Sequence, residues 1–468
     1  MRMRLHHLNR LIVAVLVVVL GGAAPAATAL APATDVDVLV IGGTPGGIAA
    51  AIAAARMGAS VILVEDSPRL GGVIATAWLT TFDMNFGPKG EHLTRGIFLE
   101  MYRRLGISFD PDDAARVFSR AIALEPGVRA MAHADLVRLI MEGSRIVGAE
   151  FKDNRWRRTV IVRAKQVIDA TDDGDIAAEA GVPFSVGRPG YRESVRWMQA
   201  ATLIFRVGGV DWHALTGDIM RRLEETTPIA WGVNGRAAWG YPDKMGRYRP
   251  IQPGIVVFPL NLALQRDGSI LINALNVTGV NGLDPESIQE GMREALAELP
   301  HLMAFLRDEI PGFERAALLG HAPELYIRET RHIHGLYTLT AGDVLGEHLF
   351  DDRVAVASYP IDLHPYYAGW TSPYAPIPIV YTLPFRAIVP RRVENLLIAS
   401  RAFSATSEAH GSARVVPTIM AVGQAAGVAA ALCARRGCTP HEIAGDRELV
   451  REVQRSLIDQ GAYLGVKP

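Results

Sequence analysis

The chain contains a glycine-rich turn that joins an apolar strand to an apolar helix, and this stretch limits its possible folds most strongly. Residues 36–41 are mostly apolar and β-branched, as in a strand buried on both faces of a parallel sheet. The turn GGTPGG occupies residues 42–47, and the alanine-rich residues 48–57 have high helix propensity. A second apolar run, residues 61–64, ends at Glu65. The pattern predicts strand, tight turn, helix and strand in an α/β fold.

The glycine spacing is typical of a loop that binds the diphosphate of a nucleotide, with a purely structural turn as the alternative. Glycine permits the sharp turn and the close approach of backbone to diphosphate, and the helix N-terminus adds unpaired N–H groups. Gly42 and Gly47 hold the first and third glycine places, whereas Thr44 holds the middle one, where its hydroxyl could donate to a phosphate oxygen. Glu65 ends the second apolar run, where an acidic side chain could bind a ribose 2′-hydroxyl and would repel the 2′-phosphate of NADP.

Two further features favour FAD over NAD. Gly71 and Gly72 follow Glu65, where the chain of a two-domain flavoprotein crosses beneath the FAD diphosphate. Late in the chain, an apolar helix is expected over residues 415–434, with Pro417 near its first turn. Such a helix directs its N-terminal N–H groups toward the negative charge of a reduced flavin. A buried core helix with small residues for close packing is the alternative.

A third segment, VIDATDDGDIAAEAGVPFSVGR at residues 167–188, repeats the order of strand, turn and small-residue helix. Its strand is expected to stop at Thr171. Asp175, in the acidic turn that follows, could bind a ribityl hydroxyl of FAD or cap the next helix.

At these places the chain resembles the FAD-dependent oxidoreductases of the glutathione-reductase-like superfamily, in a subgroup often found among secreted bacterial proteins. The resemblance covers nearly the whole chain after Ala31 and is also carried by IRETRHIHGLYTLTAGDVL, SYPIDLHP, LPFRAIVP and NLLIASRAFSATSEAHGSARVVPTIMAVGQAAGVAAAL. It implies a non-covalently bound FAD and an α/β fold: a Rossmann-like, three-layer FAD-binding domain assembled from both chain ends, with an inserted α+β substrate domain.

The middle of the chain has the composition expected of that inserted domain. Runs at residues 201–207, 255–260 and 269–275 are strand-like and indicate a sheet. Residues 285–306 predict an amphipathic helix that Asp284 caps. The expected units are a signal peptide (1–31), the first segment of the FAD-binding domain (32–187), the substrate-binding domain (188–385), the second segment of the FAD-binding domain (386–440) and a C-terminal helix (441–468).

The N-terminus, over positions 1–31, has the pattern of a secretory signal peptide. Arg2, Arg4 and Arg10 precede the apolar run at positions 11–20, and small side chains follow. The apolar run is shorter than the roughly 20 residues of a membrane span. We therefore expect a secreted or periplasmic protein with no stable membrane insertion after cleavage, and an uncleaved membrane anchor is the alternative.

The charge balance and the cysteines exclude some classes of partner and site. The 48 Lys and Arg residues nearly balance the 49 Asp and Glu residues, so no single-sign field recruits nucleic acid. Cys433 and Cys438 fit neither a redox Cys-x-x-Cys motif nor a zinc site, and are expected to be two thiols or a local disulfide. We expect a small-molecule substrate, no metal and no nucleic-acid partner, while the electron acceptor is unknown.

Histidine is the natural base for an FAD-dependent oxidation near neutral pH, because a proton must leave the O–H or N–H beside the C–H that is oxidised. The resemblance places His364 and His410 at the isoalloxazine face, although either could be a structural histidine. Asp362 lies two residues before His364, on the same side of an extended segment, and could orient it. Arg328 and Arg331 would be one turn apart on a helix and could clamp a carboxylate or the flavin, or anchor domains through ion pairs.

The remaining candidates are two arginines and an aromatic cluster. Arg401 is expected near the flavin pyrimidine and Arg414 beside the N-terminus of the last long helix. The aromatic residues Tyr366, Tyr367, Trp370 and Tyr374 could stack on a sugar or an aromatic ring, or form a packed loop. The predicted cofactor-binding residues are Gly42, Gly43, Thr44, Pro45, Gly46, Gly47, Glu65, Asp66, Gly71, Gly72, Val137 (adenine), Thr171, Asp175, Arg401, Arg414 and Thr418.

These observations predict an exported FAD-dependent oxidoreductase that oxidises a small polar organic substrate by hydride transfer to flavin N5. Dioxygen, a quinone or a protein would take the electrons. One alternative is an FAD-dependent reductase, although residues 184–385 contain no second glycine fingerprint for NAD(P)H. The other is a degenerate flavin-binding protein without turnover.

Overall fold

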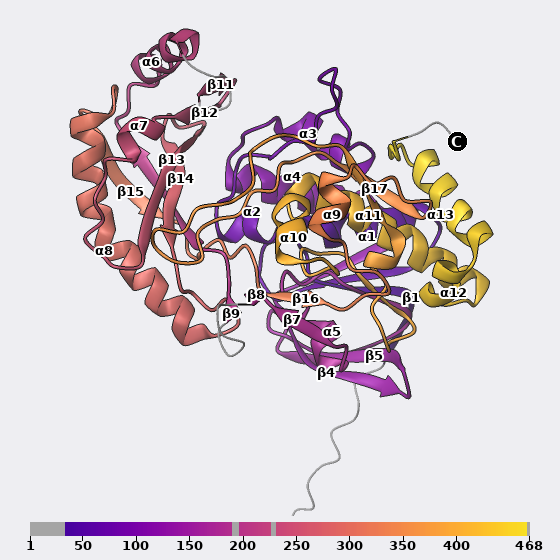
Figure 1. The fold of residues 1–468 in the computed structure, drawn as a ribbon. Coiled ribbons are helices and arrows are strands. Elements are labelled where there is room, and N and C mark those ends of the chain that lie inside the picture. The colour runs from indigo at the N-terminus through magenta and orange to yellow at the C-terminus, as the bar shows by residue number, and fades with distance from the viewer. Residues whose placement is uncertain (1–32, 190–195, 226–230, 466–468) are drawn as a thin grey trace, which may run out of the picture.

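The structure is a computed structural model that describes residues 33–189, 196–225 and 231–465. The expected signal peptide lies outside these described residues. Figure 1 shows a main body in which N-terminal strands lie beside C-terminal helices, and a second body formed by the middle of the chain. This arrangement confirms the predicted α/β, Rossmann-like fold with a domain inserted between the segments from the two chain ends.

The main body contains strands from both chain ends. They are β1 (Thr34–Ile41), β2 (Val61–Glu65), β3 (Val128–Ala132), β4 (Ala134–Glu142), β5 (Arg145–Asp153), β6 (Arg158–Asp169) and β19 (Leu396–Ile398). Among the described residues they form a seven-stranded sheet in the order β3-β2-β1-β6-β5-β4, with β19 also paired to β6. The pairs among β3, β2, β1, β6 and β19 are parallel, whereas β4 and β5 extend the sheet in antiparallel fashion.

The register brings the carboxyl ends of four parallel strands to one edge. Ile41 at the end of β1 is opposite both Val64 and Asp169, and Asp169 is also opposite Ile398. Ligands of parallel α/β sheets bind at this edge because the loops that follow the strands converge there.

Two helices from opposite chain ends, α1 (Pro45–Arg56) and α11 (Val416–Arg436), pack closely together. A Cβ atom at Gly423 would lie 2.1 Å from the carbonyl oxygen of Gly46, and one at Gly427 would lie 2.1 Å from that of Ala50. Close packing is therefore the role of these two glycines. Helix α11 is apolar and long enough to cross a membrane, but 94% of its most apolar window is buried, as in a core helix.

The second body is an antiparallel sheet with a long helix. Its strands are β10 (Ala201–Gly208), β11 (Gly232–Asn234), β12 (Ala237–Gly240), β13 (Ile255–Leu264), β14 (Ile270–Val277) and β15 (Ala317–His321), and its helices are α6 (Trp212–Glu225), α7 (Pro242–Met245) and α8 (Pro285–Glu309). The strand order within the described residues is β11-β12-β13-β14-β10-β15. The three predicted strands and the predicted helix are confirmed, and Asp284 caps α8 by accepting from the N–H of Glu286.

The hydrophobic cores divide the chain differently from the expected limits. The core of the second body runs from Ala201 to Leu325, whereas Ile333 and later apolar residues pack into the main core. The chain therefore returns to the main body near residue 330, earlier than the expected limit at residue 385.

The other elements connect and cover these two sheets. They are α2 (Val73–Thr76), α3 (Ile97–Leu105), α4 (Pro111–Ala123), α5 (Asp175–Glu179), β7 (Phe184–Val186), β8 (Arg188–Pro189), β9 (Arg196–Trp197), β16 (Arg331–Ile333), α9 (Ala341–Leu345), β17 (Arg353–Ala357), β18 (Tyr381–Pro384), η1 (Phe385–Ala387), α10 (Ser407–Ala413), α12 (Pro440–Gly445) and α13 (Arg447–Asp459). The expected C-terminal helix is divided in two at Asp446, which caps α13. Cys433 and Cys438 are free thiols with their Sγ atoms 3.6 Å apart.

Candidate functional site

The turn between β1 and α1 is held together by Thr44. Its Oγ1 accepts from the N–H of Gly47 at 3.3 Å, which caps α1, and donates to the carbonyl oxygen of Ala170 at 2.9 Å. The prediction that this hydroxyl donates to a phosphate is wrong, because the hydroxyl donates its single hydrogen to Ala170, in the segment after β6. A diphosphate here would be bound by backbone N–H groups and the helix N-terminus.

Two glycines bring this turn close to its neighbours. Gly42 has φ +109°, and a Cβ atom there would lie 2.4 Å from the carbonyl carbon and oxygen of Ala170. A Cβ atom at Gly72 would lie 3.2 Å from the Thr44 side chain, so the second glycine pair does pass directly beneath the turn. Both residues line the same cavity.

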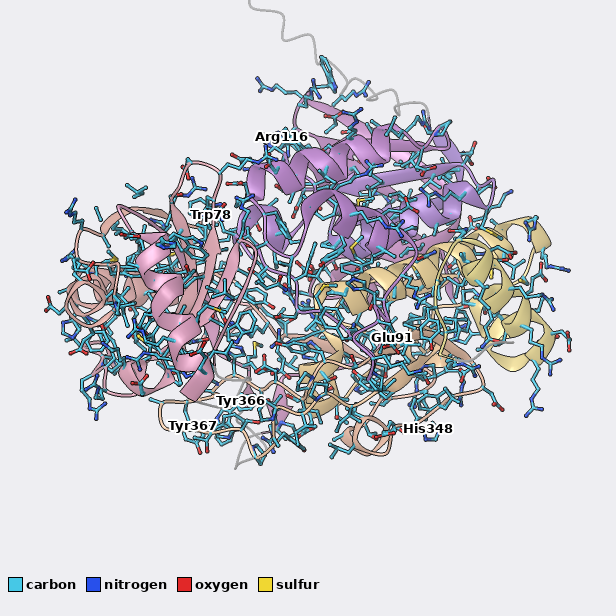
Figure 2. The ribbon with its side chains drawn as sticks, turned by 90° about the horizontal axis from the view of Figure 1, so that it is seen from above. Trp78, Glu91, Arg116, His348, Tyr366 and Tyr367 are labelled. Atoms are coloured by element: carbon cyan, nitrogen blue, oxygen red, sulfur yellow. The ribbon has the colours of Figure 1, made fainter. Side chains whose placement is uncertain are left out.

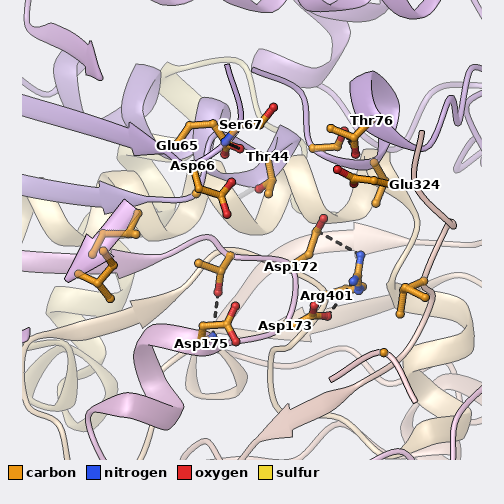
Figure 3. Close-up of a pocket in the computed structure, with 18 of the residues that line it drawn as sticks. Thr44, Glu65, Asp66, Ser67, Thr76, Asp172, Asp173, Asp175, Glu324 and Arg401 are labelled. Atoms are coloured by element: carbon orange, nitrogen blue, oxygen red, sulfur yellow. Dashed lines mark hydrogen bonds and ion pairs between the residues drawn. The ribbon is translucent and has the colours of Figure 1, made fainter. Parts of the chain in front are cut away.

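This cavity, of 540 Å³, follows the carboxyl edge of the parallel strands (Figure 3). Its lining includes Glu65 and Asp66 after β2, Gly42, Thr44 and Gly72 of the two glycine turns, and Thr171, Asp172 and Arg401 after β6 and β19, together with Leu136 and Phe151. Figure 3 shows Glu65 and Asp66 on one side of Thr44 and Asp172 and Arg401 on the other, as an extended dinucleotide requires.

The side chain of Val137, the predicted adenine contact, does not face the cavity. Val137 is 52% exposed, whereas its neighbour Leu136 lines the cavity. Successive strand residues point to opposite faces, and the pairing of β4 with β5 is irregular between Leu136 and Arg138. The assignment therefore missed the cavity-facing side by one position.

Glu65 lies at the place predicted for the ribose-binding carboxylate. Its Oε2 accepts from the N–H of Gly43 at 2.5 Å, and its Oε1 accepts from the N–H of Ser67 at 3.0 Å. Burial, together with the neighbouring Asp66, raises the pKa of Glu65 to about 8. The carboxyl group thus joins the end of β2 to the glycine turn and lines the cavity beside Asp66.

Arg401, after β19, crosses to the acidic turn after β6. Its Nη1 lies 3.3 Å from Oδ1 of Asp172 and its Nη2 lies 2.7 Å from Oδ1 of Asp173 (Figure 3). Its side chain is buried and lines the cavity. The guanidinium therefore lowers the negative charge of this turn where an anionic cofactor would lie.

Asp175 does not cap α5, because Gly174 occupies the N-cap position. Its Oδ1 instead accepts from Nη1 of Arg331 at 2.6 Å, and its N–H donates to Oγ1 of Thr171 at 2.9 Å. Asp175 and Thr171 both line the cavity, so their predicted contacts with the ribityl chain remain predictions.

A smaller cavity continues the first toward the N-terminus of α11. Asp172 and Arg401 line both, and the smaller one is also lined by Pro45, Tyr326, Arg414, Val416 and Ile419. The predicted contact at Thr418 does not fit, because Thr418 is buried outside this lining and its Oγ1 accepts from Nδ2 of Asn85 at 2.8 Å. This smaller cavity, of 30 Å³, lies at the N-terminus of α11, where the isoalloxazine is predicted to lie.

His364 is fixed in one tautomer by the second sheet. Its Nδ1 lies 2.9 Å from Oδ1 of Asn276, while Nδ2 of Asn276 donates to the carbonyl oxygen of Ala274 at 3.0 Å. Since the amide nitrogen is committed to a carbonyl, Oδ1 of Asn276 is an acceptor and Nδ1 of His364 is the donor. The lone pair of His364 therefore lies on Nε2.

Asp362 joins this histidine to the smaller cavity. Its Oδ2 lies 3.4 Å from Nε2 of His364 and accepts from Nη2 of Arg414 at 3.0 Å. Burial alone would raise the pKa of Asp362, but His364 and Arg414 hold it below its usual range. Burial, and then the charge of Arg328, lowers the pKa of His364 to about 4, so the imidazole is neutral at neutral pH.

His410, the other predicted base, is buried inside α10 away from the lining of both cavities. Its ring packs edge-to-face on His332, with centroids 4.9 Å apart. Burial, and then His332, holds the pKa of His410 well below its usual range. His332 in turn contacts Oε1 of Glu329 at 2.9 Å, so His410 belongs to a buried structural cluster rather than to the candidate site.

Arg328 and Arg331 do not form a clamp, because the segment before β16 is not helical. Nη1 of Arg328 donates to the carbonyl oxygen of Ala200 at 2.8 Å and to Oγ1 of Thr202 at 2.7 Å. Arg331 instead points to the turn after β6. Arg331 forms an ion pair with Asp175 at 2.6 Å, as the structural alternative predicted, whereas the hydrogen bonds of Arg328 are to uncharged acceptors.

A further cavity, of 590 Å³, is lined by two of the four residues of the aromatic cluster. Trp370 and Tyr374 line it, together with Tyr359, Asp362 and Phe258. Tyr366 is buried and contacts Oγ of Ser407 at 2.7 Å, whereas Tyr367 is exposed; Figure 2 shows both at one edge of the molecule.

Sequence reasoning missed Asp83 and Asn276. Burial raises the pKa of Asp83 to about 6, and the Tyr359 hydroxyl hydrogen-bonds it beside Asp362. Asn276 begins an Asn-Val-Thr pattern that resembles a glycosylation signal. However, Asn276 is only 1% exposed, and its side-chain amide forms hydrogen bonds with His364 and Ala274. No local pattern signals either role, because their partners are distant in sequence.

Comparisons with known proteins show which family the chain matches. A family model described as FAD dependent oxidoreductase matches residues 37–457. No curated protein matches the chain. Similar solved structures include p-nitrophenol 4-monooxygenase from Pseudomonas putida, with 11% identity and a TM-score of 0.44, covering 93% of this chain and 91% of that one. They also include a flavin-dependent brominase, with 14% identity and a TM-score of 0.45, covering 90% of this chain and 85% of that one. A geranylgeranyl bacteriochlorophyll reductase-like protein from Thermoplasma acidophilum has 12% identity and TM-score 0.43, covering 92% and 85%.

Proposed function

The chain belongs to the FAD dependent oxidoreductase family, and on this premise we propose that it dehydrogenates an alcohol with His364 as the base. The observation that supports this role most directly is the fixed tautomer, which leaves the Nε2 lone pair beside the Asp362 carboxylate. Two acceptors 3.4 Å apart are suited to one shared hydrogen, such as that of a substrate hydroxyl.

The cofactor is FAD. The residues present fit it, because Gly42 brings the turn to the carboxyl edge, Glu65 lies at the ribose end and Arg401 lies at the other. When bound, FAD supplies the acceptor for the two electrons of the substrate C–H bond.

The protein groups handle the proton. The hydroxyl proton of the substrate moves to Nε2 of His364, and the imidazolium that forms lies beside the Asp362 carboxylate. Asn276 keeps the ring oriented, and Arg414 holds Asp362 through its Nη2. Asp362 is thus a positioning and charge-stabilising residue.

We further propose that the protein is exported, acts on a small organic molecule through its polar hydroxyl group and belongs to the glutathione-reductase-like superfamily. The signal-peptide pattern at positions 1–31 and the glycine motifs support these proposals. N-terminal sequencing of protein from its host tests cleavage: export predicts a chain that begins near residue 32, and an intact Met1 contradicts cleavage.

The function is tested by the visible absorption of the purified protein under anaerobic conditions. We expect bound flavin and bleaching of its band by an alcohol substrate. If dithionite bleaches the band but no member of a broad panel of alcohols does, dehydrogenation of an alcohol is contradicted.

The pH profile provides a further prediction. The neutral form of His364 is active, so kcat/KM should stay level as the pH falls from about 8 to about 5 and decline about tenfold per unit below the His364 pKa of about 4. An unperturbed histidine would cause the decline near pH 6.5. Since Asp83 has a pKa of about 6, the profile is repeated in Asp83→Asn. A midpoint of 6 to 7 that persists in Asp83→Asn contradicts the assignment.

Removal of the Arg401 charge should weaken FAD binding. Arg401→Gln leaves Asp172 and Asp173 uncompensated in the cavity, and we expect the Kd for FAD to rise about 10- to 100-fold, since a hydrogen bond to a charged group contributes about 1.5–3 kcal/mol. Flavin fluorescence titration measures this change. Arg386→Gln is the matched control, because it breaks the ion pair with Asp352 (2.9 Å) outside the cavity lining. Equal FAD affinity in both variants contradicts the prediction.

A further inference from the structure

The cavity lined by Phe258 and Trp370 adjoins the proposed reaction site. Asp362 lines it and also accepts from Arg414, which lines the isoalloxazine end of the cofactor cavity. The Phe258 ring stacks on His364, with centroids 5.0 Å apart and an interplanar angle of 20°. The ion pair between Asp362 and Arg414 therefore connects this cavity to the cofactor end, and Asp362 also lies beside His364, the proposed base.

The wall of this cavity is conformationally restricted. Four of its lining residues are prolines, which fix φ and reduce the conformational entropy lost when a ligand binds. These are Pro360, Pro365, Pro376 and Pro378. Trp370 is braced from behind by Tyr366, whose ring is perpendicular to it at 4.9 Å.

The lining chemistry selects the ligand. Phe258, Trp370 and Tyr374 present rings, and the Asp362 side chain is 36% exposed beside them. Among the lining side chains that the structure describes, none is positively charged, so carboxylate and phosphate ligands have no partner there. Rings bind a flat apolar group, and a carboxylate accepts from a hydroxyl.

We propose that this cavity binds the substrate and selects a primary alcohol on an aromatic ring, an arylmethanol. This inference rests on the proposed function. The ring lies against Trp370 and Tyr374, and the hydroxyl lies at Asp362, the lining residue whose Oδ2 is 3.4 Å from Nε2 of His364. In the reaction the C–H bond breaks with both electrons going to the bound flavin, the O–H proton goes to His364, and the C=O bond of an aldehyde forms.

The test uses the FAD-loaded protein and measures binding separately from turnover. Benzyl alcohol, cyclohexylmethanol and glucose are titrated while tryptophan fluorescence and the flavin band are recorded. We expect benzyl alcohol to bind at least 10-fold more tightly than the other two, and Trp370→Leu and Tyr374→Leu each to weaken it about 3- to 10-fold. Trp156→Leu, at an exposed tryptophan outside the cavity, is the matched control and should not alter binding.

The outcomes separate the two proposals. Equal binding of the three alcohols, or equal binding by Trp370→Leu, Tyr374→Leu and Trp156→Leu, overturns the cavity assignment. If benzyl alcohol binds in the expected way but neither it nor any other alcohol bleaches the flavin, the proposed function fails and the cavity assignment stands. If another alcohol bleaches the flavin while benzyl alcohol neither binds nor reacts, the cavity assignment fails and the function stands. Flavin content and circular dichroism identify misfolded variants. If either Trp370→Leu or Tyr374→Leu is misfolded, the other variant tests the cavity assignment.

Discussion

Replacing His364 with glutamine is expected to lower the rate of flavin reduction by about 10²- to 10⁴-fold, the usual contribution of a general base. The reason is geometric: the variant loses the Nε2 lone pair that Asn276 directs toward Asp362. Binding of FAD should not change, because His364 does not line the cofactor cavity. Anaerobic stopped-flow absorption with an excess of alcohol measures the rate.

The control for this variant is His410→Gln. His410 is buried beside His332, so its substitution should lower the free energy of unfolding and leave the rate of flavin reduction within about threefold of wild type. A larger loss of rate in folded His410→Gln than in His364→Gln would reverse the assignment of the base.

Alanine at Gly42 is expected to destabilise the protein and to abolish FAD retention. The residue has φ +109°, and the new Cβ atom would lie 2.4 Å from the carbonyl group of Ala170. Backbone strain contributes about 1–3 kcal/mol to the loss of stability, and overpacking contributes about 1–3 kcal/mol more. Denaturant unfolding and the flavin content after purification measure the two effects.

Gly58 offers a matched comparison. It has φ +88°, but a Cβ atom there meets nothing within 4 Å. Gly58→Ala should therefore lower the free energy of unfolding by about 1–2 kcal/mol, through backbone strain alone, and should retain FAD. If Gly42→Ala and Gly58→Ala lose the same stability and both keep FAD, the close approach at Gly42 is not required.

Local patterns predicted the elements that surround the cofactor. The glycine turn and the flanking apolar runs predicted β1, α1 and β2, and Asp284 followed by Pro285 predicted the start of α8. Such predictions succeed because the partners of each backbone group lie close by in the chain, where propensity and capping act.

The predictions that failed concern side chains whose partners are distant. Thr44 donates to Ala170 rather than to a ligand, and Leu136 rather than Val137 lines the cavity, since successive strand residues point to opposite faces. Whether a buried polar group faces a ligand or another residue depends on which donors and acceptors the fold brings within about 3 Å. Spacing along the chain does not contain this information.

The sequence by itself determined a nucleotide-binding turn, two chain ends that build one α/β domain, and a middle segment with its own sheet. Only the tertiary structure decided between His364 and His410, because each histidine follows an acidic residue two positions earlier in the sequence, Asp362 and Glu408. The fold places one against Asn276 and Asp362 and the other against His332. The tautomer and pKa of a histidine depend on such contacts, and contacts between residues far apart in the chain exist only after folding.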